Sequence, residues 1–130
     1  MRVVPGAYRP RGLQMKRELK TPSKARLDAM VDEATVDCNN ESEQASGLFT
    51  MIEEHLALPF ETLILGVPVM VTKVDISDRD EVIAICKRGG VAQRIAILDI
   101  PLPSPAPAGV EWIAAYRHWM RGRDVAPLLG

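Results

Sequence analysis

The chain has 130 residues, of which 47% are hydrophobic and 25% are charged, and its formal net charge is −1. These values are close to the averages of globular proteins, so they exclude a largely disordered chain and favour one domain around a single core. No apolar run approaches the roughly 18 residues that a membrane-spanning helix needs, and the N-terminus lacks the apolar stretch of a secretory signal. We therefore expect a cytoplasmic protein with no membrane partner.

The charged residues divide the chain into a basic leader and an acidic remainder. Residues 1–26 hold eight basic residues and one acid, a net charge of +7, whereas residues 27–130 hold the other eight basic residues and sixteen acids, a net charge of −8. Prolines and glycines interrupt residues 1–22 and no period persists there, which predicts a disordered leader. Its charge alone could attract nucleic acid, but without interleaved aromatic side chains nucleic acid is not an expected partner.

Two apolar stripes with helical spacing follow the leader. The first comprises Leu27, Met30, Val31, Ala34 and Cys38, and the second comprises Ala45, Leu48, Phe49, Ile52 and Leu56. Ser23 is the expected N-cap, and Pro59 ends the helical region. Asn39 and Asn40 favour caps and turns, so the stripes belong either to one bent helix or to two helices. Gly47 weakens a helix by about 1 kcal/mol relative to Ala, so we expect a neighbouring element to pack closely against it.

Four short runs rich in β-branched residues come next, and turn residues bound them. They span residues 62–65, 69–74, 82–86 and 94–98. Gly89 and Gly90 supply the positive φ angles of a tight hairpin between the last two runs. Four antiparallel strands with tight links favour a small barrel similar to an SH3-like fold, by analogy of pattern alone.

A proline-rich connector at residues 101–109 precedes a last predicted helix, which runs from about Val110 to Arg121. Trp112, Tyr116 and Trp119 share one face of this helix. Large aromatic side chains in such a pattern are typical of a core, so we expect them to be buried against the rest of the domain.

These elements predict an α+β fold, in which the N-terminal helical region and the C-terminal helix pack on a small antiparallel, SH3-like, barrel-type sheet. The domain spans residues 23–122, and residues 123–130 form a C-terminal tail. Cys38 and Cys86 lie far apart in sequence and in different apolar patterns, which favours two buried free thiols over a disulfide.

The sequence contains no recognisable catalytic motif. Neither His55 nor His118 has the partners that nucleophilic catalysis needs, and the chain has no GxSxG, HExxH, CxxC or phosphate-binding glycine loop. We expect a protein without enzymatic activity.

Oxygen-bearing side chains in the helical region form the remaining signal. On an unbroken helix one face would carry Glu33, Asp37, Asn40, Glu41 and Gln44, at offsets of zero, four, seven, eight and eleven. Like charges four residues apart repel by a few tenths of a kcal/mol, and a bound divalent cation would turn that repulsion into attraction. The same pattern fits an ordinary solvated helix face, so the residues alone leave both interpretations open.

Calcium takes about six to eight oxygen ligands, so one helix face cannot complete its coordination. Further carboxylates are available at Glu53, Glu54, Asp75, Asp78, Asp80 and Glu81. The segment from Asp75 to Asp80 is not an EF-hand loop, because Ser77 and Arg79 stand at acidic positions and Asp80 stands where glycine is required. A calcium site in this chain would combine separate segments.

Two segments carry a resemblance to a known family. Residues 36–47 read VDCNNESEQASG and residues 52–60 read IEEHLALPF. In order and spacing they resemble the CcbP-like bacterial calcium-binding family, and a weaker likeness continues through the strands and from Glu111 to Trp119. The resemblance implies an α+β fold that holds calcium through surface carboxylates without an EF-hand. By matching position it assigns that role to Asp37, Glu41, Glu43, Glu53 and Glu54.

The chain departs from the family pattern at Ser42, at Arg79 and in its basic leader. The resemblance therefore implies weak calcium affinity, on the order of 10⁻⁵–10⁻³ M. The alternative is a protein-interaction module that has lost calcium binding and uses the SH3-like sheet or the proline-rich connector to contact a protein partner.

Overall fold

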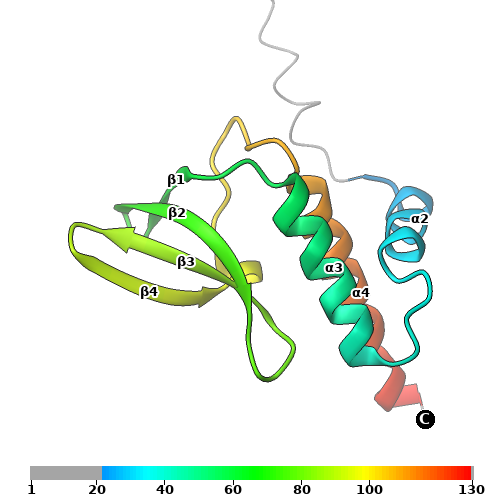
Figure 1. Ribbon diagram of the computed structural model, residues 1–130. Coiled ribbons are helices and arrows are strands. Elements are labelled where there is room, and N and C mark those ends of the chain that lie inside the picture. Colours follow the sequence, from blue (N-terminus) through cyan, green and yellow to red (C-terminus); the bar gives the residue numbers. More distant parts are fainter. Residues whose placement is uncertain (1–21, 130) are drawn as a thin grey trace, which may run out of the picture.

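A computed structural model describes residues 22–129 of the chain, with side chains up to Arg123. The predicted disordered leader therefore lies outside the described residues, apart from its last position. The elements in chain order are α2 (Lys24–Ala34), α3 (Glu41–His55), β1 (Phe60–Ile64), β2 (Val67–Ile76), β3 (Val82–Arg88), β4 (Val91–Ala96), the 3-10 turn η1 (Ile97–Asp99) and α4 (Val110–Leu129). Figure 1 shows the helices gathered on one side and the sheet on the other, so the α+β prediction is confirmed.

The helical region forms two helices, which decides between the two alternatives that the sequence left open. Ser23 caps α2, because its side chain accepts a hydrogen bond from the backbone N–H of Arg26. Asn40 caps α3 in the same way, accepting from the N–H of Glu43 at 2.9 Å. Between the caps, Asp37 adopts a left-handed backbone with φ of 66°. An extended cap and a left-handed residue cannot continue a helix, so the chain turns there.

Close backbone contact explains the glycine inside α3. A Cβ atom added at Gly47 would overlap the carbonyl oxygen of Ala34, the last residue of α2. The expectation that Gly47 lies against a neighbouring element is therefore confirmed. Gly109 has a similar role at the start of α4, where it lies against the backbone of His55.

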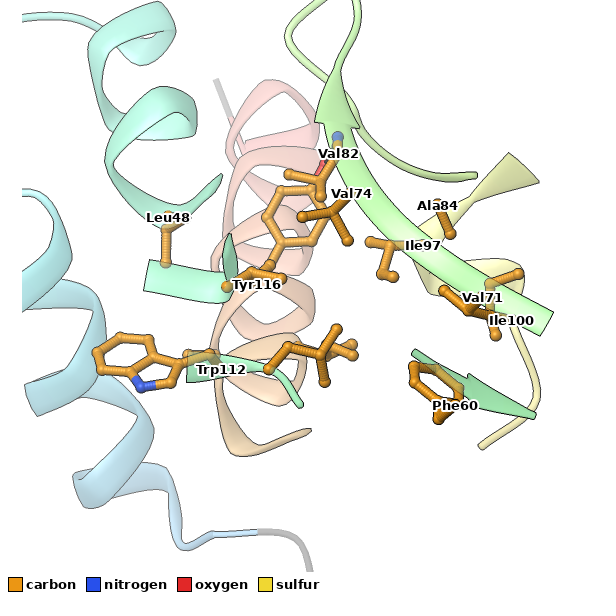
Figure 2. Close-up of a cluster of buried hydrophobic side chains, with 14 of the residues drawn as sticks. Leu48, Phe60, Val71, Val74, Val82, Ala84, Ile97, Ile100, Trp112 and Tyr116 are labelled. Carbon is orange, nitrogen blue, oxygen red and sulfur yellow. Dashed lines mark hydrogen bonds between the residues drawn. The ribbon is translucent and has the colours of Figure 1, made fainter. Parts of the chain in front are cut away.

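The core extends from the sheet across α3 and α4 to α2, which contributes Leu27 and Met30. Trp112 and Tyr116 of α4 are buried, as the spacing predicted, and Trp119 is half-buried. Figure 2 shows Tyr116 between Leu48 of α3 and Val82 of β3. The hydroxyl oxygen of Tyr116 accepts a hydrogen bond from the backbone N–H of Val82 at 3.1 Å, which satisfies a buried polar group on each element.

The sheet is an antiparallel meander in the order β1-β2-β3-β4. A register shift between Val71 and Lys73 bends β2 where it passes the helices. After β4 the turn η1 leads the chain back toward β1, where the hydroxyl of Thr62 donates to the carbonyl oxygen of Pro101. No further strand closes the sheet among residues 22–129, so it is open and not a complete barrel.

Several boundaries differ from those expected. Helix α4 continues to Leu129, eight residues beyond the predicted end, so most of the expected C-terminal tail is helical. Strand β4 begins at Val91 and ends at Ala96, and the next residues form η1 instead of extending the strand. Within the part of the chain that the structure describes, no helix has the length and apolarity needed to cross a membrane.

Both cysteines are free thiols, as expected. Cys86 is buried on β3, and this burial raises the pKa of its thiol. Cys38 is only half-buried, which differs from the expectation, because it lies in the turn between α2 and α3. Its thiol donates to the carbonyl oxygen of Glu43 at 3.4 Å.

Candidate functional site

The five oxygen donors expected on one helix face do not share one. Glu33 lies in the last turn of α2, Asp37 lies in the connecting turn, and only Glu41 and Gln44 belong to α3. The prediction assumed an unbroken helix, and the cap at Asn40 removes that assumption. The stripe is therefore divided between two helices that run in different directions (Figure 1).

Several of these donors already have partners within the protein. One carboxylate oxygen of Glu43 accepts a hydrogen bond from the backbone N–H of Asn39, the residue before the N-cap of α3, at 2.7 Å. Gln44 accepts from the indole N–H of Trp119 at 2.9 Å, which ties α3 to α4. Glu41 forms an ion pair with Arg123 at 3.3 Å, and the guanidinium of Arg123 lies 4.9 Å from the centre of the Trp119 ring. These contacts give Glu43 and Gln44 structural roles.

Two acidic segments far apart in sequence do meet at the beginning of α3. The hydroxyl of Ser42 donates to a carboxylate oxygen of Asp80 at 3.2 Å, although 38 residues separate them. This contact brings the first turn of α3, with Glu41 and Glu43, against the loop that joins β2 to β3. That loop carries three of the candidate carboxylates, namely Asp78, Asp80 and Glu81.

The loop itself has a well-defined local structure. The hydroxyl oxygen of Ser77 accepts hydrogen bonds from the backbone N–H groups of Arg79 and Glu81, each at 3.2 Å. The N–H of Asp80 donates to the carbonyl oxygen of Ser77, and Asp80 adopts a positive φ of 64°. A serine and an aspartate suit this turn, since both tolerate local hydrogen bonding in place of regular structure. These hydrogen bonds define the shape of the loop.

Other candidate carboxylates lie apart from this junction. Glu53 and Glu54 are exposed in the last turn of α3, and the twelve residues between Glu41 and Glu53 correspond to about 18 Å along the helix axis. Asp75 lies on β2 and pairs with Arg94 of β4 at 2.9 Å. The hydrogen bond from Arg94, followed by one from the N–H of Ile76, lowers the pKa of Asp75.

The carboxylates at the junction do not form a ready cation cage. Among the residues that the structure describes, no three His, Cys, Asp or Glu side chains lie together in a group that could hold a metal ion. Glu41, Glu43, Asp78 and Glu81 are exposed, and Asp80 is half-buried. A cation at the junction would need these exposed side chains to rotate toward it and water to supply its remaining ligands.

Sequence reasoning missed a second polar cluster, between α2 and α4. A carboxylate oxygen of Asp28 lies 2.6 Å from Nε2 of His118, and the other accepts from the ammonium of Lys24 at 3.0 Å. Hydrogen bonding, from His118 first and then from Lys24, lowers the pKa of Asp28. Asp28 and His118 border a surface cleft of about 620 Å³ near Trp119 and Arg123. Nothing in the sequence signals a pairing across 90 residues.

Comparison with known proteins adds no relative. No protein-family model, no curated protein and no solved structure matches this chain. The proposed function therefore rests on the chemistry of the acidic residues and on their positions in the fold.

Proposed function

We propose that this protein binds calcium weakly and without enzymatic activity, at the junction between the first turn of α3 and the loop from β2 to β3. The hydrogen bond from Ser42 to Asp80 carries the proposal, because it brings two acidic segments together that are remote in sequence. The donors are Glu41 and Glu43 on one side and Asp78, Asp80 and Glu81 on the other.

The chemistry of calcium suits such a surface. Calcium is a hard cation that accepts six to eight carboxylate, carbonyl and water oxygens in flexible geometry, so exposed carboxylates can gather around it with water completing the coordination. The resemblance of residues 36–60 to the CcbP-like calcium-binding family supports the same assignment for Glu41 and Glu43. The resemblance also assigns this role to Asp37, Glu53 and Glu54, which are not part of the proposed site.

Two features of the junction oppose a cation and keep the affinity low. The N-terminus of α3 carries the positive end of the helix dipole, which costs about 0.3–1 kcal/mol for a nearby cation. Glu41 also has to share its carboxylate with Arg123. We therefore expect a dissociation constant on the order of 10⁻⁵–10⁻³ M.

Calorimetric titration with Ca²⁺ and with Mg²⁺ tests the proposal. In a variant carrying Glu41→Gln and Asp80→Asn the calcium heat should disappear, because both charges are lost while the amides still accept the existing hydrogen bonds. The matched control carries Glu53→Gln and Glu54→Gln, which removes the same charge at the far end of α3 and should retain the heat of binding. A wild-type protein that gives no heat at millimolar calcium, or a control that loses it equally, would contradict the junction site.

A second candidate function is protein interaction through the sheet. Large apolar side chains are exposed at the end of the sheet that lies away from the helices: Val67 is 39% exposed, Leu65 is 98% exposed and Val91 is 68% exposed. Apolar side chains gathered in one region of a monomer surface mark contact sites more often than scattered ones do. A calcium-binding role at the junction does not account for them. Binding to a protein partner that persists in the presence of a chelator would separate this function from the first.

A further inference from the structure

The apolar face of the sheet extends beyond the helices that cover it. Val71 pairs with Cys86, and Cys86 pairs with Gln93, so alternate residues along these strands point to the same side as the core. Toward the hairpin ends this face becomes a shallow groove of about 390 Å³, with Ile64, Val67, Val69, Val91 and Ile95 along it. No carboxylate lines the groove, whereas Lys87 and Arg88 do.

Strand β4 leaves one edge of the sheet free beside this groove. It pairs with β3 from Val91 to Ala96, and within residues 22–129 no strand lies on its other side. The opposite edge differs, because Pro101 lies against Thr62 of β1. Proteins usually protect a free edge with proline, a bulge or several charges, and β4 has only one charged residue, Arg94. Its unpaired backbone groups can therefore accept another extended chain.

The two faces of β4 offer different chemistry. Val91, Gln93 and Ile95 point to the groove, and Ala92, Arg94 and Ala96 point to the other face. Lys87, the register partner of Ala92, shares the face of Arg94. The ion pair between Arg94 and Asp75 is about half exposed on both sides, so a competing carboxylate can reach the guanidinium. Arg88, the register partner of Val91, lies at the hairpin end of the groove face and donates to the carbonyl oxygen of Pro68 at 3.1 Å. One face of an added strand would therefore meet mainly apolar groups and the other would meet positive charge.

The turn between β1 and β2 provides an independent observation. Leu65 is 98% exposed and has a positive φ of 52°, between Ile64 and Val67 of the groove. A hairpin turn of this kind favours asparagine, aspartate or glycine, because a bulky side chain is strained at positive φ and gains nothing in water. Folding thus gives no reason for leucine at this position, which adds an exposed apolar side chain next to the groove residues Ile64 and Val67.

We propose that the free edge of β4 binds an extended segment of a partner protein, as an added strand whose side chains alternate between apolar and acidic. Its apolar side chains would enter the groove, and its carboxylates would face Arg94 and Lys87. This inference rests on the second candidate function and names its partner class. A second copy of this chain would bring like basic residues together at the edge of β4. Residues 1–26 of the chain carry a net charge of +7. Charge repulsion therefore disfavours both a second copy and this basic segment as the occupant.

Peptide titration on the full chain tests the proposal directly. The probe is a labelled synthetic peptide of alternating valine and glutamate, compared with one of alternating valine and lysine, by fluorescence anisotropy with a chelator present. We expect the glutamate peptide to bind, more weakly as salt is added, and the lysine peptide to bind at least about tenfold less tightly.

Two variants with matched controls locate the binding. Arg94→Glu should weaken the binding of the glutamate peptide at least about tenfold. Arg79→Glu, which makes the same charge change in the loop between β2 and β3, should leave that binding unchanged. Leu65→Asn should also weaken it while leaving the melting temperature equal or higher, because asparagine tolerates positive φ. Val36→Asn, an exposed apolar residue between α2 and α3 and away from the sheet, should leave peptide affinity unchanged. If Leu65 had only a structural role, Leu65→Asn would lower the peptide affinity and the melting temperature together.

The possible outcomes separate this inference from the function on which it rests. Preference for the lysine peptide, or unchanged affinity in Arg94→Glu, would overturn the acidic partner class and leave an interaction role standing. Failure of both peptides to bind the folded wild-type chain would overturn both. If instead the chain elutes as a dimer that Arg94→Glu or Val91→Lys alters, the occupant is a second copy and the proposal is wrong.

Discussion

At the scale of single residues, Gly47 shows how a tertiary contact can reverse an intrinsic preference. Replacing a helix-interior glycine with alanine normally stabilises a helix by about 1 kcal/mol. At Gly47 the added methyl group would meet the carbonyl oxygen of Ala34, a backbone atom that cannot move aside. The sequence could show that this glycine was costly, and therefore that something packed against it, but not which element did so.

We predict that Gly47→Ala lowers the free energy of unfolding by about 1–3 kcal/mol, the usual cost of overpacking. Gly122→Ala is the matched control, since Gly122 lies in α4 with nothing within 4 Å of an added Cβ. That variant should be stabilised by up to about 1 kcal/mol. Urea unfolding of the three proteins measures both values, and a neutral or stabilising Gly47→Ala would show that α2 and α3 are farther apart than described.

At the scale of elements, the break between α2 and α3 determines where the carboxylates lie. Sequence periodicity would place five oxygen donors on one face only if the helix continued unbroken from Glu33 to Gln44. Asn40 was correctly identified as a residue that favours caps, yet a cap and a helix interior differ only in the backbone conformation that the fold selects. Once the chain turns there, Ser42 in the first turn of α3 contacts Asp80 of the loop from β2 to β3, and Glu33 does not belong to the same site.

We predict that Asn40→Ala lowers the free energy of unfolding by about 1 kcal/mol, because the N–H of Glu43 loses its acceptor. Asn39→Ala is the control, since the side chain of Asn39 does not cap α3, and it should be close to neutral. Helical content by circular dichroism should change little in either folded variant. Equal effects at the two positions would contradict the assignment of Asn40 as the cap.

At the scale of the whole molecule, the contact between Asp28 and His118 joins α2 to α4 across 90 residues. The hydrogen bonds from His118 and Lys24 hold the pKa of Asp28 below its usual 3.8 in the folded state. A carboxyl whose pKa is lower when folded stabilises the fold above its unfolded pKa, and that contribution is lost as the pH falls through the folded value. The pairing therefore favours the folded state at neutral pH and not in strong acid.

We predict that Asp28→Asn unfolds at a lower urea concentration than the wild type at neutral pH, and that the difference shrinks below about pH 4 as the wild-type carboxyl is protonated. Asp32→Asn, one turn along the exposed side of α2, should change the midpoint less at every pH. A difference that persists unchanged into acid would mean that the Asp28 carboxylate contributes nothing to folding.

Patterns along neighbouring residues predicted the fold class, the order of the elements, the cap at Ser23 and the tight turn at Gly89 and Gly90, where only Gly89 has a positive φ. The free thiols followed from the separation of the two cysteines in the sequence. Which distant groups meet depends on the tertiary structure, as for Ser42 with Asp80, Asp28 with His118, and the free edge of β4 beside an uncovered apolar groove. These contacts depend on how helices and strands pack in three dimensions. A periodic pattern along the chain gives no distances between elements. It could therefore identify candidate carboxylates but could not show which of them lie close together.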